Sequence, residues 1–333
     1  MRIMHELNQL EFGGVEKVIR NIIKFDNENQ HSILAYKDGP YKEALIEAGA
    51  EILIPTEKNQ VNVDADVLHI HTGGDVSNVA LNYGKHFPII ETIHSPIKSP
   101  MRPEYIKQRI GVSDAVTKIN NNCKTIYNGL DLKELEPTIE DKFIKSLLGM
   151  ADPSLPVIGR LGRIGYDKGL EDWLLTCYYL QQNGLDFYPL IIGGEALNSK
   201  GYIGKLKLMV ESLPVKNVIW TGHIDDVANY LQIMDVFLYP SATEGFGLVF
   251  AEAMYNEAIV VTYDTPVANE VVGGHGILTP KTIDGLMYGV QQALNKEMVE
   301  AIMPIARDFV ATEFNAELMA QKYTEVYKNV CEN

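Results

Sequence analysis

The residues best suited to chemistry stand in one segment, SATEGFGLVFAEAM at 241–254. Glu244 and Glu252 lie eight residues apart around Gly245-Phe246-Gly247. If a helix begins near Gly247, Glu252 falls in its second turn and Glu244 precedes it. The first backbone amides of such a helix have no partner inside it and suit phosphate oxygens; they belong to Phe246, Gly247, Leu248 and Val249. An ordinary helix with two exposed glutamates accounts for the spacing of the acids, but not for the glycines between them.

A second candidate is the loop Gly162–Gly169, which follows the apolar run Val157–Leu161 and carries Arg163 and Lys168. Two cations at this spacing can converge on one diphosphate, Arg as a planar fork and Lys as a point charge. Two solvated surface cations are the plainer alternative. However, residues 151–333 carry 12 Lys and Arg against 23 Asp and Glu. In so acidic a segment, cations beside glycines at a strand end favour an anion site. Arg160, inside the run, is interpreted as structural.

Weaker signals stand in the first half of the chain. Gly13 and Gly14 precede a helical pattern, and paired glycines at a helix start let an anion approach closely; a plain turn is the alternative. His94 ends the apolar run 88–93, at the edge where ligands bind in open α/β sheets; a core histidine is the alternative. His69 and His71 alternate along one strand, but no Cys or carboxylate stands at ligand spacing, so no metal site is predicted.

Short apolar runs alternate with helical periods along the whole chain, which predicts an α/β fold with parallel sheets. The predicted strands are a short first strand and the runs 33–36, 52–54, 67–70, 88–93, 125–127, 157–161, 188–192, 218–221, 236–239 and 258–262. The segment DPSLP at 152–156 resembles a linker. We therefore expect a first lobe at 1–150, a second at 151–303 and a helical tail at 304–333.

Composition narrows the functional classes. A net charge of −15 repels nucleic-acid backbones, so nucleic acid is not an expected partner. Three cysteines far apart support neither a disulfide framework nor a zinc site. The N-terminus lacks the apolar run of a signal peptide, and we expect a cytoplasmic protein. The basic stretch 98–109 is a candidate for a phosphate-bearing acceptor or for peripheral contact with the inner face of a membrane; a solvated face is an equal alternative.

In this order, the motifs resemble the retaining glycosyltransferases of the GT-B fold, family 4, known as glycosyl transferases group 1. The TEGFG-x4-E block and the R-x4-K loop are the specific matches; GGVEKVI, DVLHIH, ETIH, GVSDAV, IYNGLDL, LIIGG and TGHIDD extend the resemblance over nearly the whole chain. It implies two Rossmann-like lobes with a cleft between them and a C-terminal helix that crosses back to the first lobe.

The resemblance also implies a role for each matching residue. Arg163 and Lys168 would neutralise the diphosphate of a nucleotide-sugar donor, with Gly13 and Gly14 approaching it from the other lobe. The amides near Leu248 and Val249 would hold phosphate, and Glu252 the ribose. Glu244, with the Phe246 and Gly247 backbone, would hold the donor sugar, and His94 would contact that sugar near the reacting centre.

The implied reaction is hexosyl transfer with retention, by a front-face mechanism that needs no metal or other cofactor. UDP is the favoured donor base and GDP the second choice. The acceptor is a glycan, a lipid-linked saccharide or a small molecule. Two alternatives stay open: a sugar-nucleotide epimerase or phosphorylase of the same fold, and a non-catalytic nucleotide-sugar-binding subunit. After Glu252 the chain reads Tyr-Asn-Glu-Ala-Ile, where the family prefers small residues.

Overall fold

The computed structural model describes residues 1–55, 64–71, 87–99 and 106–332. Its contacts divide the chain into two compact units. The first comprises Met1–Asp131 together with Glu313–Asn333, and the second comprises Leu132–Thr312. The last helix therefore belongs to the same unit as the first strand.

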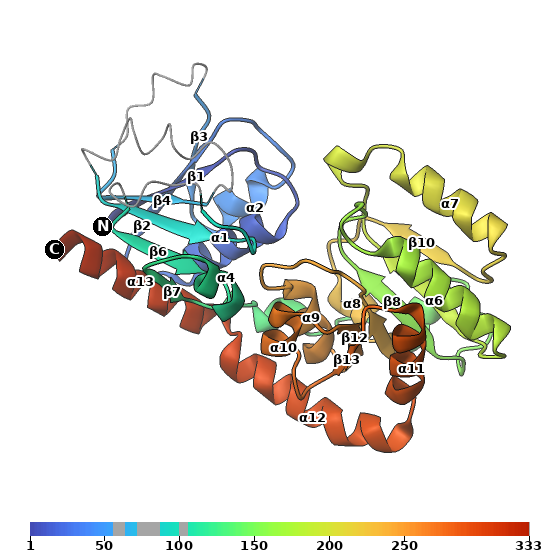
Figure 1. Ribbon diagram of the computed structural model, residues 1–333. Helices are drawn as coiled ribbons and strands as arrows, with labels where there is room; N and C mark the ends of the chain where they lie inside the picture. Colours follow the sequence, from blue (N-terminus) through green and yellow to red (C-terminus); the bar gives the residue numbers. More distant parts are fainter. Residues whose placement is uncertain (56–63, 72–86, 100–105, 333) are drawn as a thin grey trace. The chain divides into compact units, whose positions relative to one another are not determined.

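A seven-stranded parallel sheet forms the centre of the first unit, in the order β3-β2-β1-β4-β5-β6-β7 (Figure 1). Its strands are β1 (Arg2–Leu7), β2 (Gln30–Ala35), β3 (Glu51–Leu53), β4 (Val67–Ile70), β5 (Ile89–Ile93), β6 (Gln108–Gly111) and β7 (Cys123–Thr125). Every residue of β4 and β5 is buried, as strands covered on both faces must be. The strand order reverses once, between β1 and β4.

The helices of this unit are α1 (Gly14–Phe25), α2 (Lys42–Glu47), α4 (Asp114–Ile119) and α13 (Ala316–Glu332). Helix α1 buries a stripe that includes Val18 and Ile22, at the spacing of one helical face. Helix α13 packs against α1. The chain enters α13 beside Leu130, whose amide donates to the Phe314 carbonyl at 2.7 Å. Distant parts of the sequence thus close one core.

The second unit is built on a six-stranded parallel sheet in the order β10-β9-β8-β11-β12-β13. Its strands are β8 (Val157–Leu161), β9 (Tyr188–Ile192), β10 (Ile219–Gly222), β11 (Val236–Leu238), β12 (Ile259–Tyr263) and β13 (Ile277–Thr279). The strand order again reverses once, here between β8 and β11. This arrangement fixes where loops can meet, because only the loops after these two strands flank the reversal.

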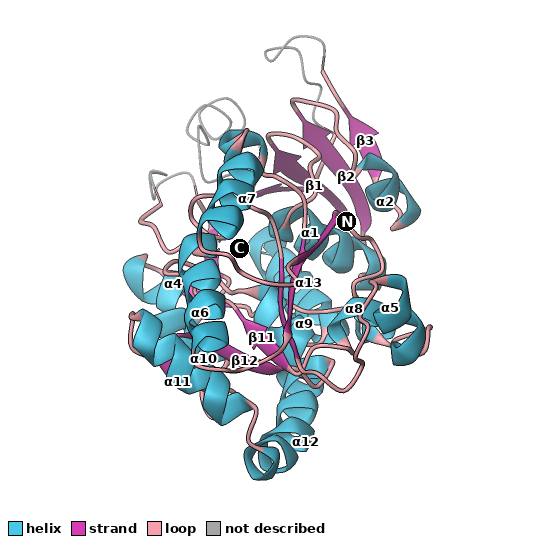
Figure 2. Ribbon diagram, turned by 90° about the vertical axis from the view of Figure 1, so that its right-hand side faces the viewer, coloured by secondary structure: helices cyan, strands magenta, loops and turns pink. Residues whose placement is uncertain are grey.

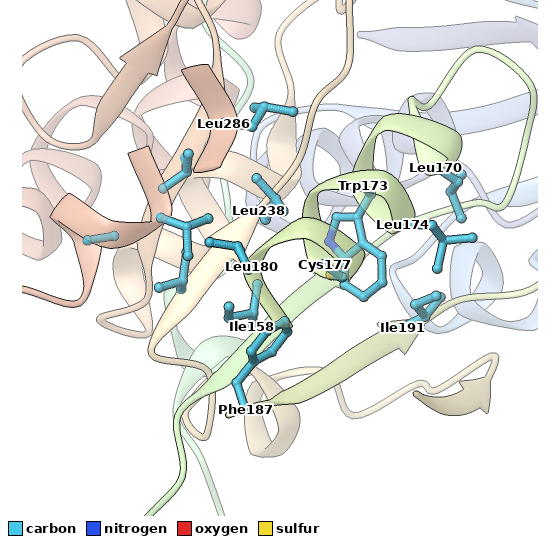
Figure 3. Close-up of a cluster of buried hydrophobic side chains, with 14 of the residues drawn as sticks. Ile158, Leu170, Trp173, Leu174, Cys177, Leu180, Phe187, Ile191, Leu238 and Leu286 are labelled. Carbon is cyan, nitrogen blue, oxygen red and sulfur yellow. The ribbon is translucent and has the colours of Figure 1, made fainter. Parts of the chain in front are cut away.

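Helices flank this sheet (Figure 2). They are α5 (Asp141–Leu147), α6 (Leu170–Gln182), α7 (Tyr202–Ser212), α8 (Ala228–Leu231), α9 (Leu248–Tyr255), α10 (Pro266–Val271), α11 (Ile283–Ala293) and α12 (Lys296–Glu313), with short 3-10 turns at Leu132–Leu135 and Leu197–Ser199. Trp173 and Leu174 of α6 pack with Ile191 of β9 in a core that Figure 3 shows. The side chains of Trp173 and Leu174 are fully buried.

The predicted fold class is confirmed, since both sheets are parallel and both have Rossmann-like strand orders. Strands β6 and β13 were not predicted, and β7 lies at 123–125 instead of 125–127. The compact units also differ in extent from the expected lobes: residues 132–150 and 304–312 cluster with the second unit. Arg307 of α12 connects these two segments, because its guanidinium donates to Glu136 at 2.8 Å and to the Tyr255 carbonyl at 2.9 Å.

Truncation of the second core tests this packing. We expect Leu174→Ala to lower the free energy of unfolding by about 2–5 kcal/mol, because it leaves a cavity at a fully buried site. Leu208→Ala in α7 is the matched control, because Leu208 is 63% exposed. It should change the free energy of unfolding by no more than about 0.5 kcal/mol. Urea unfolding of both variants measures the difference, and equal costs at the two leucines would contradict the packing.

Candidate functional site

The two strongest sequence motifs flank the strand reversal of the second sheet. Strand β8 ends at Leu161 and leads into the loop with Arg163 and Lys168, while β11 ends at Leu238 and leads into the loop with Glu244. Ligands of open α/β sheets bind outside the carboxyl ends of the strands at such a switch point. Topology therefore places both motifs at the position expected of a binding site.

Lys168 and Glu244 meet directly, although 76 positions separate them in the sequence. The Lys168 Nζ lies 2.8 Å from a Glu244 carboxylate oxygen and 3.4 Å from Asp167. The side chains of Lys168 and Glu244 are only 13% and 15% exposed. Burial alone would lower the pKa of Lys168, but the negative potential of Tyr239 and Glu244 raises it above the ordinary value. The lysine is thus a fixed cation at the switch point.

Arg163 stands in the same loop with an exposed side chain. Its backbone carbonyl accepts a hydrogen bond from Nη2 of Arg160 at 3.4 Å. Arg160 is completely buried in β8, with its guanidinium 5.2 Å from the Tyr239 ring centre. Burial lowers the pKa of Arg160 and raises that of Tyr239 to about 12, where Glu244 adds to the effect.

Arg160 of β8 has the structural role that the sequence indicated. It supports the segment that carries Arg163, and its Nε and Nη1 have no hydrogen-bond partner among the described residues. A charged residue in an otherwise apolar strand was the available signal.

Two glycines allow the loops to approach each other. Gly169 has φ 62°, and a side chain there would collide with the Pro240 carbonyl of the neighbouring loop. Gly247 has φ 78°, and a Cβ there would meet the Phe250 ring. Glycine is the residue that adopts positive φ without strain. Gly169 therefore lets the two loops approach each other, and Gly247 lets the second loop turn into α9.

Helix α9 begins at Leu248, with Gly247 as its N-cap, as the sequence predicted. The amides of Leu248 and Val249 are at its N-terminus, where intrahelical partners are lacking. Glu252 lies in the second turn and is only 4% exposed. The alternative of a surface helix with two exposed glutamates is therefore wrong.

The glycine pair of the first unit begins α1. Gly13 is the N-cap in extended backbone, and Gly14 is the first helical residue. A side chain at Gly13 would meet the carboxylate of Glu16. The structure thus confirms a helix start at this point, whereas contact of the two glycines with a diphosphate stays a prediction.

His94 belongs to a row of hydrogen-bonded histidines that the sequence did not reveal. Its Nε2 lies 3.1 Å from Nδ1 of His71, and Nε2 of His71 lies 3.0 Å from Nδ1 of His5. Nε2 of His5 lies 3.0 Å from Nδ1 of His31, and Nε2 of His31 lies 3.2 Å from Oδ2 of Asp26. The row runs from the loop after β5 across β4 and β1 to β2 and the segment after α1.

Strand register explains why the rings meet. His5 pairs directly with His69 across β1 and β4, and with Ile33 across β1 and β2. His71 and His31 stand two positions from these partners, so all four side chains point to one face of the sheet. The pairing of β1 with β2 and β4 was the missing information, because the sequence alone showed only the alternation of His69 and His71.

His69 lies beside this row but has other partners. Its Nδ1 is 2.8 Å from the Tyr327 hydroxyl, and its Nε2 is 2.7 Å from Oγ1 of Thr92. Tyr323 also contacts Thr92, at 3.1 Å. Both tyrosines are on α13, so the last helix covers the histidines of the first sheet. Within the described part of the chain, ring nitrogens of His5, His69 and His71 form the one group with the spacing for a metal ion; the absence of a metal stays a prediction.

Burial keeps these histidines neutral near pH 7. It lowers the pKa of His5, His69 and His71 far below the ordinary value, with neighbouring histidines adding to the effect. It also lowers the pKa of His94, to about 4.

The basic stretch 98–109 lies partly outside the described residues, which omit 100–105. Where it is described, Lys98 and Lys107 are exposed, and the expectation of a basic surface needs correction only at Arg109. Arg109 is on β6, is 8% exposed and pairs with the buried Glu91 at 3.0 Å. It serves the core of the first unit and is not a surface cation.

A pocket of the second unit lies away from the motifs. Asp235, which precedes β11, and Glu257, which precedes β12, line it together with Arg307 of α12. These positions mark the amino edge of the parallel strands, opposite the switch-point loops. None of the predicted site residues lines this pocket.

Comparison with known proteins identifies the second unit. Residues 150–308 match the family Glycosyl transferases group 1. This match covers just under half of the chain. This confirms the resemblance drawn from the switch-point motifs, at the level of the group 1 family.

Two curated relatives of this chain are named for polysaccharide synthesis. One is the lipopolysaccharide core biosynthesis mannosyltransferase LpsB of Rhizobium meliloti, 26% identical over 45% of this chain and 42% of its own. The other is the capsular polysaccharide biosynthesis glycosyltransferase CapM of Staphylococcus aureus, 28% identical over 51% of this chain and 45% of its own. Each match thus spans less than half of the relative's length.

A solved structure shares the fold over nearly the full length. Anabaena HepE, in complex with UDP and glucose, superposes with a TM-score of 0.86 at 19% identity, covering 98% of this chain and 99% of HepE. Both units of this chain therefore have counterparts in one known fold. In the described residues, no helix is long and apolar enough to cross a membrane.

The lowered histidine pKa values predict how stability depends on pH. In the unfolded chain these histidines take up protons as pH falls below about 6.5. In the folded chain they resist protonation, because burial lowers the pKa of His94 to about 4 and that of His5, His69 and His71 well below the ordinary value. The contribution of neutral His5, His69, His71 and His94 is therefore fully present above pH 6.5 and is lost as pH falls. At pH 5, unfolding should take up about four protons at these side chains.

Thermal unfolding between pH 7.5 and 5, with calorimetry in two buffers to count protons, measures this dependence. A His223→Asn variant is the control, because the His223 side chain is 47% exposed. It should show the same decline as the unchanged protein. A midpoint that stays constant down to pH 5 would show that the buried histidines do not resist protonation.

Proposed function

We propose that this chain transfers a hexosyl unit from a nucleotide-diphosphate sugar, with UDP as the favoured base and GDP second, to a saccharide, a lipid-linked saccharide or a small molecule. The observation that carries the proposal is the pairing of Lys168 with Glu244 at the switch point, directly before the N-terminus of α9. The match of residues 150–308 to group 1 glycosyltransferases supports it. So does the common fold with HepE, which was solved with UDP-glucose.

The proposed mechanism follows from where charge develops. When a sugar–phosphate bond breaks, negative charge accumulates on the leaving diphosphate. Arg163, Lys168 and the amides of Leu248 and Val249 form a set of fixed donors that stabilises this charge as it develops. These groups do the work that a divalent cation does in other sites, so we propose a reaction without metal or other cofactor.

Glu244 has two proposed tasks. Its carboxylate accepts from Lys168 and holds that ammonium in position, and its remaining oxygen lone pairs accept hydrogen bonds from donor-sugar hydroxyls. Glu252 is proposed for the ribose hydroxyls, and His94, with Gly13 and Gly14, for the sugar and diphosphate on the side of the first unit. Retention of configuration by a front-face route, in which the leaving phosphate takes the acceptor's proton, completes the proposal.

The acceptor class is proposed from the relatives. LpsB and CapM are named for the synthesis of lipopolysaccharide core and capsular polysaccharide. We therefore propose a growing glycan or its lipid-linked precursor as the acceptor, with the reaction in the cytoplasm. Peripheral contact with a membrane is part of this proposal only for a lipid-linked acceptor.

Neutral replacement of the charged pair tests the mechanism. Lys168→Met and Glu244→Gln should each lower kcat/KM at least about a hundredfold. Lys168→Met removes a cation that stabilises the developing negative charge, and Glu244→Gln removes the carboxylate that holds this cation and accepts from the donor sugar. Lys296→Met is the matched control, since the Lys296 side chain is 88% exposed on α12. Release of nucleoside diphosphate from a panel of donors, with mixed glycan acceptors, measures the rate.

The outcomes separate the competing functions. Full activity of Lys168→Met would remove the lysine from the mechanism. A UDP-sugar that changes configuration at another carbon without acceptor would indicate an epimerase. Donor binding without turnover would indicate a binding subunit, and no binding of any nucleotide sugar would sink the proposal.

A further inference from the structure

We propose that Asp26, His31, His5 and His71 form a directional hydrogen-bond chain that holds His94 as the Nε2–H tautomer, with Nδ1 of His94 as an acceptor for a ligand hydroxyl. His5 and His31 are on strands β1 and β2, and His71 and His94 directly follow β4 and β5. Adjacent histidines lie 3.0–3.1 Å apart through ring nitrogens, and His31 lies 3.2 Å from Oδ2 of Asp26. The assignment of His94 to a donor sugar rests on the proposed function, but the tautomer does not.

The carboxylate at one end sets the direction. An ionised carboxylate only accepts hydrogen bonds, so Nε2 of His31 must donate to Asp26. In the neutral ring that the proposal gives His31, Nδ1 is then an acceptor and takes the Nε2–H of His5; a doubly protonated His31 would donate through both nitrogens and reverse the row. The same step repeats from His71 to His5 and from His94 to His71. Each histidine donates through Nε2 and accepts through Nδ1.

The number of N–H protons equals the number of hydrogen bonds in the row. Four neutral histidines carry four N–H protons, and the row has four links. Every link therefore has one donor and one acceptor, with no proton left over. Within the described residues, Nδ1 of His94 is the one ring nitrogen of the row without a link, and His94 is the one partly exposed histidine of the row. The unsatisfied acceptor thus stands at the end of the row that is partly exposed.

Asp26 is suited to remain ionised. Burial would raise its pKa, but hydrogen bonds from His31, Asn29 and the Glu28 amide lower it below the ordinary value. Asn29 donates at 2.7 Å and Glu28 N at 3.0 Å. A carboxylate held in this way keeps the row oriented and does not accept its proton. Asp26, His31, His5 and His71 are therefore positioning residues for His94.

The ligand class follows from the tautomer. A neutral histidine with a bare Nδ1 accepts a hydrogen bond and does not attract an anion, so a sugar hydroxyl fits and a phosphate does not. The opposite tautomer would present an N–H to the ligand. The same ring would then prefer a carbonyl, phosphate or carboxylate oxygen.

Binding of a metal ion is the competing arrangement, and it predicts the opposite tautomer of His94. An ion on His5 Nδ1, His71 Nε2 and His69 would convert the link between His5 and His71 into two ligand bonds. His71 would then donate through Nδ1, and His94 would carry its proton on Nδ1. The geometry favours the hydrogen-bond chain, because both nitrogens of His69 already have hydroxyl partners.

Nitrogen NMR of the full chain labelled in histidine reads the tautomer directly, without donor or acceptor. The unchanged protein at pH 7.5 should show protonated Nε2 and bare Nδ1 at His94, His71, His5 and His31. In the unchanged protein, a proton on Nδ1 of His94 would by itself overturn the proposal. Stoichiometric binding of added zinc sulfate, lost in His69→Gln, would also overturn it.

The Asp26→Asn variant should reverse the chain. Oδ1 of Asp26 accepts from the Glu28 amide, so the asparagine oxygen should take that place and its NH2 should replace Oδ2, which accepts from both His31 and Asn29. The Asn29 amide must then turn its own oxygen toward this NH2, and the NH2 donates to His31. His31 must then accept through Nε2, and the proton of His94 moves to Nδ1. Asp131→Asn is the matched control, because Asp131 is a buried carboxylate paired with Lys24 outside the row. Its His94 signal should not change.

Activity supplies a separate readout. Asp26→Asn should lower kcat of sugar transfer about tenfold or more, by analogy with a catalytic histidine held in the wrong tautomer, while Asp131→Asn keeps the rate. If no transfer occurs in any form, the NMR result still decides the tautomer. If Asp26→Asn leaves the tautomer of His94 unchanged, the chain fails whatever the activity. If Asp26→Asn does not fold, the spectrum of the unchanged protein decides alone.

Discussion

Each unit of this protein depends on one topological constraint, the single reversal of strand order in a parallel sheet. All strands of a parallel sheet release their loops at the same edge, and the loops after the two strands at the reversal flank the crevice in which ligands bind. In the second unit the reversal brings the loop after β8 and the loop after β11 together, and with them Lys168 and Glu244. In the first unit the reversal between β1 and β4 places His5 beside His69. In both units, strand order therefore determines which residues become neighbours at the site.

Buried polar groups are the second consequence of this architecture. Strands covered on both faces leave little water for a polar side chain, so each one needs a partner in the protein. The histidines of the first sheet meet this requirement by bonding to one another, to Thr92 and to the tyrosines of α13. Helix α13 is thus more than a cover for apolar surface, since its hydroxyl groups complete the polar layer beneath it. Arg160 is one of several exceptions, with two guanidinium nitrogens left without a partner among the described residues.

The sequence predicted what local patterns can encode. The helix start at Leu248, the strand before Arg163 and the α/β class follow from glycine placement and apolar runs, and the structure agrees. Strand β6 was missed because Gln108 and Arg109 interrupt its apolar pattern, and Arg109 is tolerated there only through its pairing with Glu91. The histidine row was missed because it depends on register between strands that are distant in sequence. Pairing of Lys168 with Glu244 was equally invisible, although each residue was singled out by its own motif.

The charge of the second unit shows why placement matters more than total charge for the proposed donor. Residues 151–333 carry nearly twice as many acidic as basic side chains, so their overall field opposes an anionic ligand. At the switch point itself, Arg160, Arg163 and Lys168 stand against Asp167 and Glu244, which leaves a small positive excess. Arg160 is buried and Lys168 is already paired, so the exposed Arg163 is the cation with the greatest freedom to meet a diphosphate. The amides at the start of α9 then supply the remaining donors, and their positions are fixed by the backbone. Affinity in such a site comes from a few donors held in place, and we therefore expect salt to weaken it less than it weakens a diffuse basic surface.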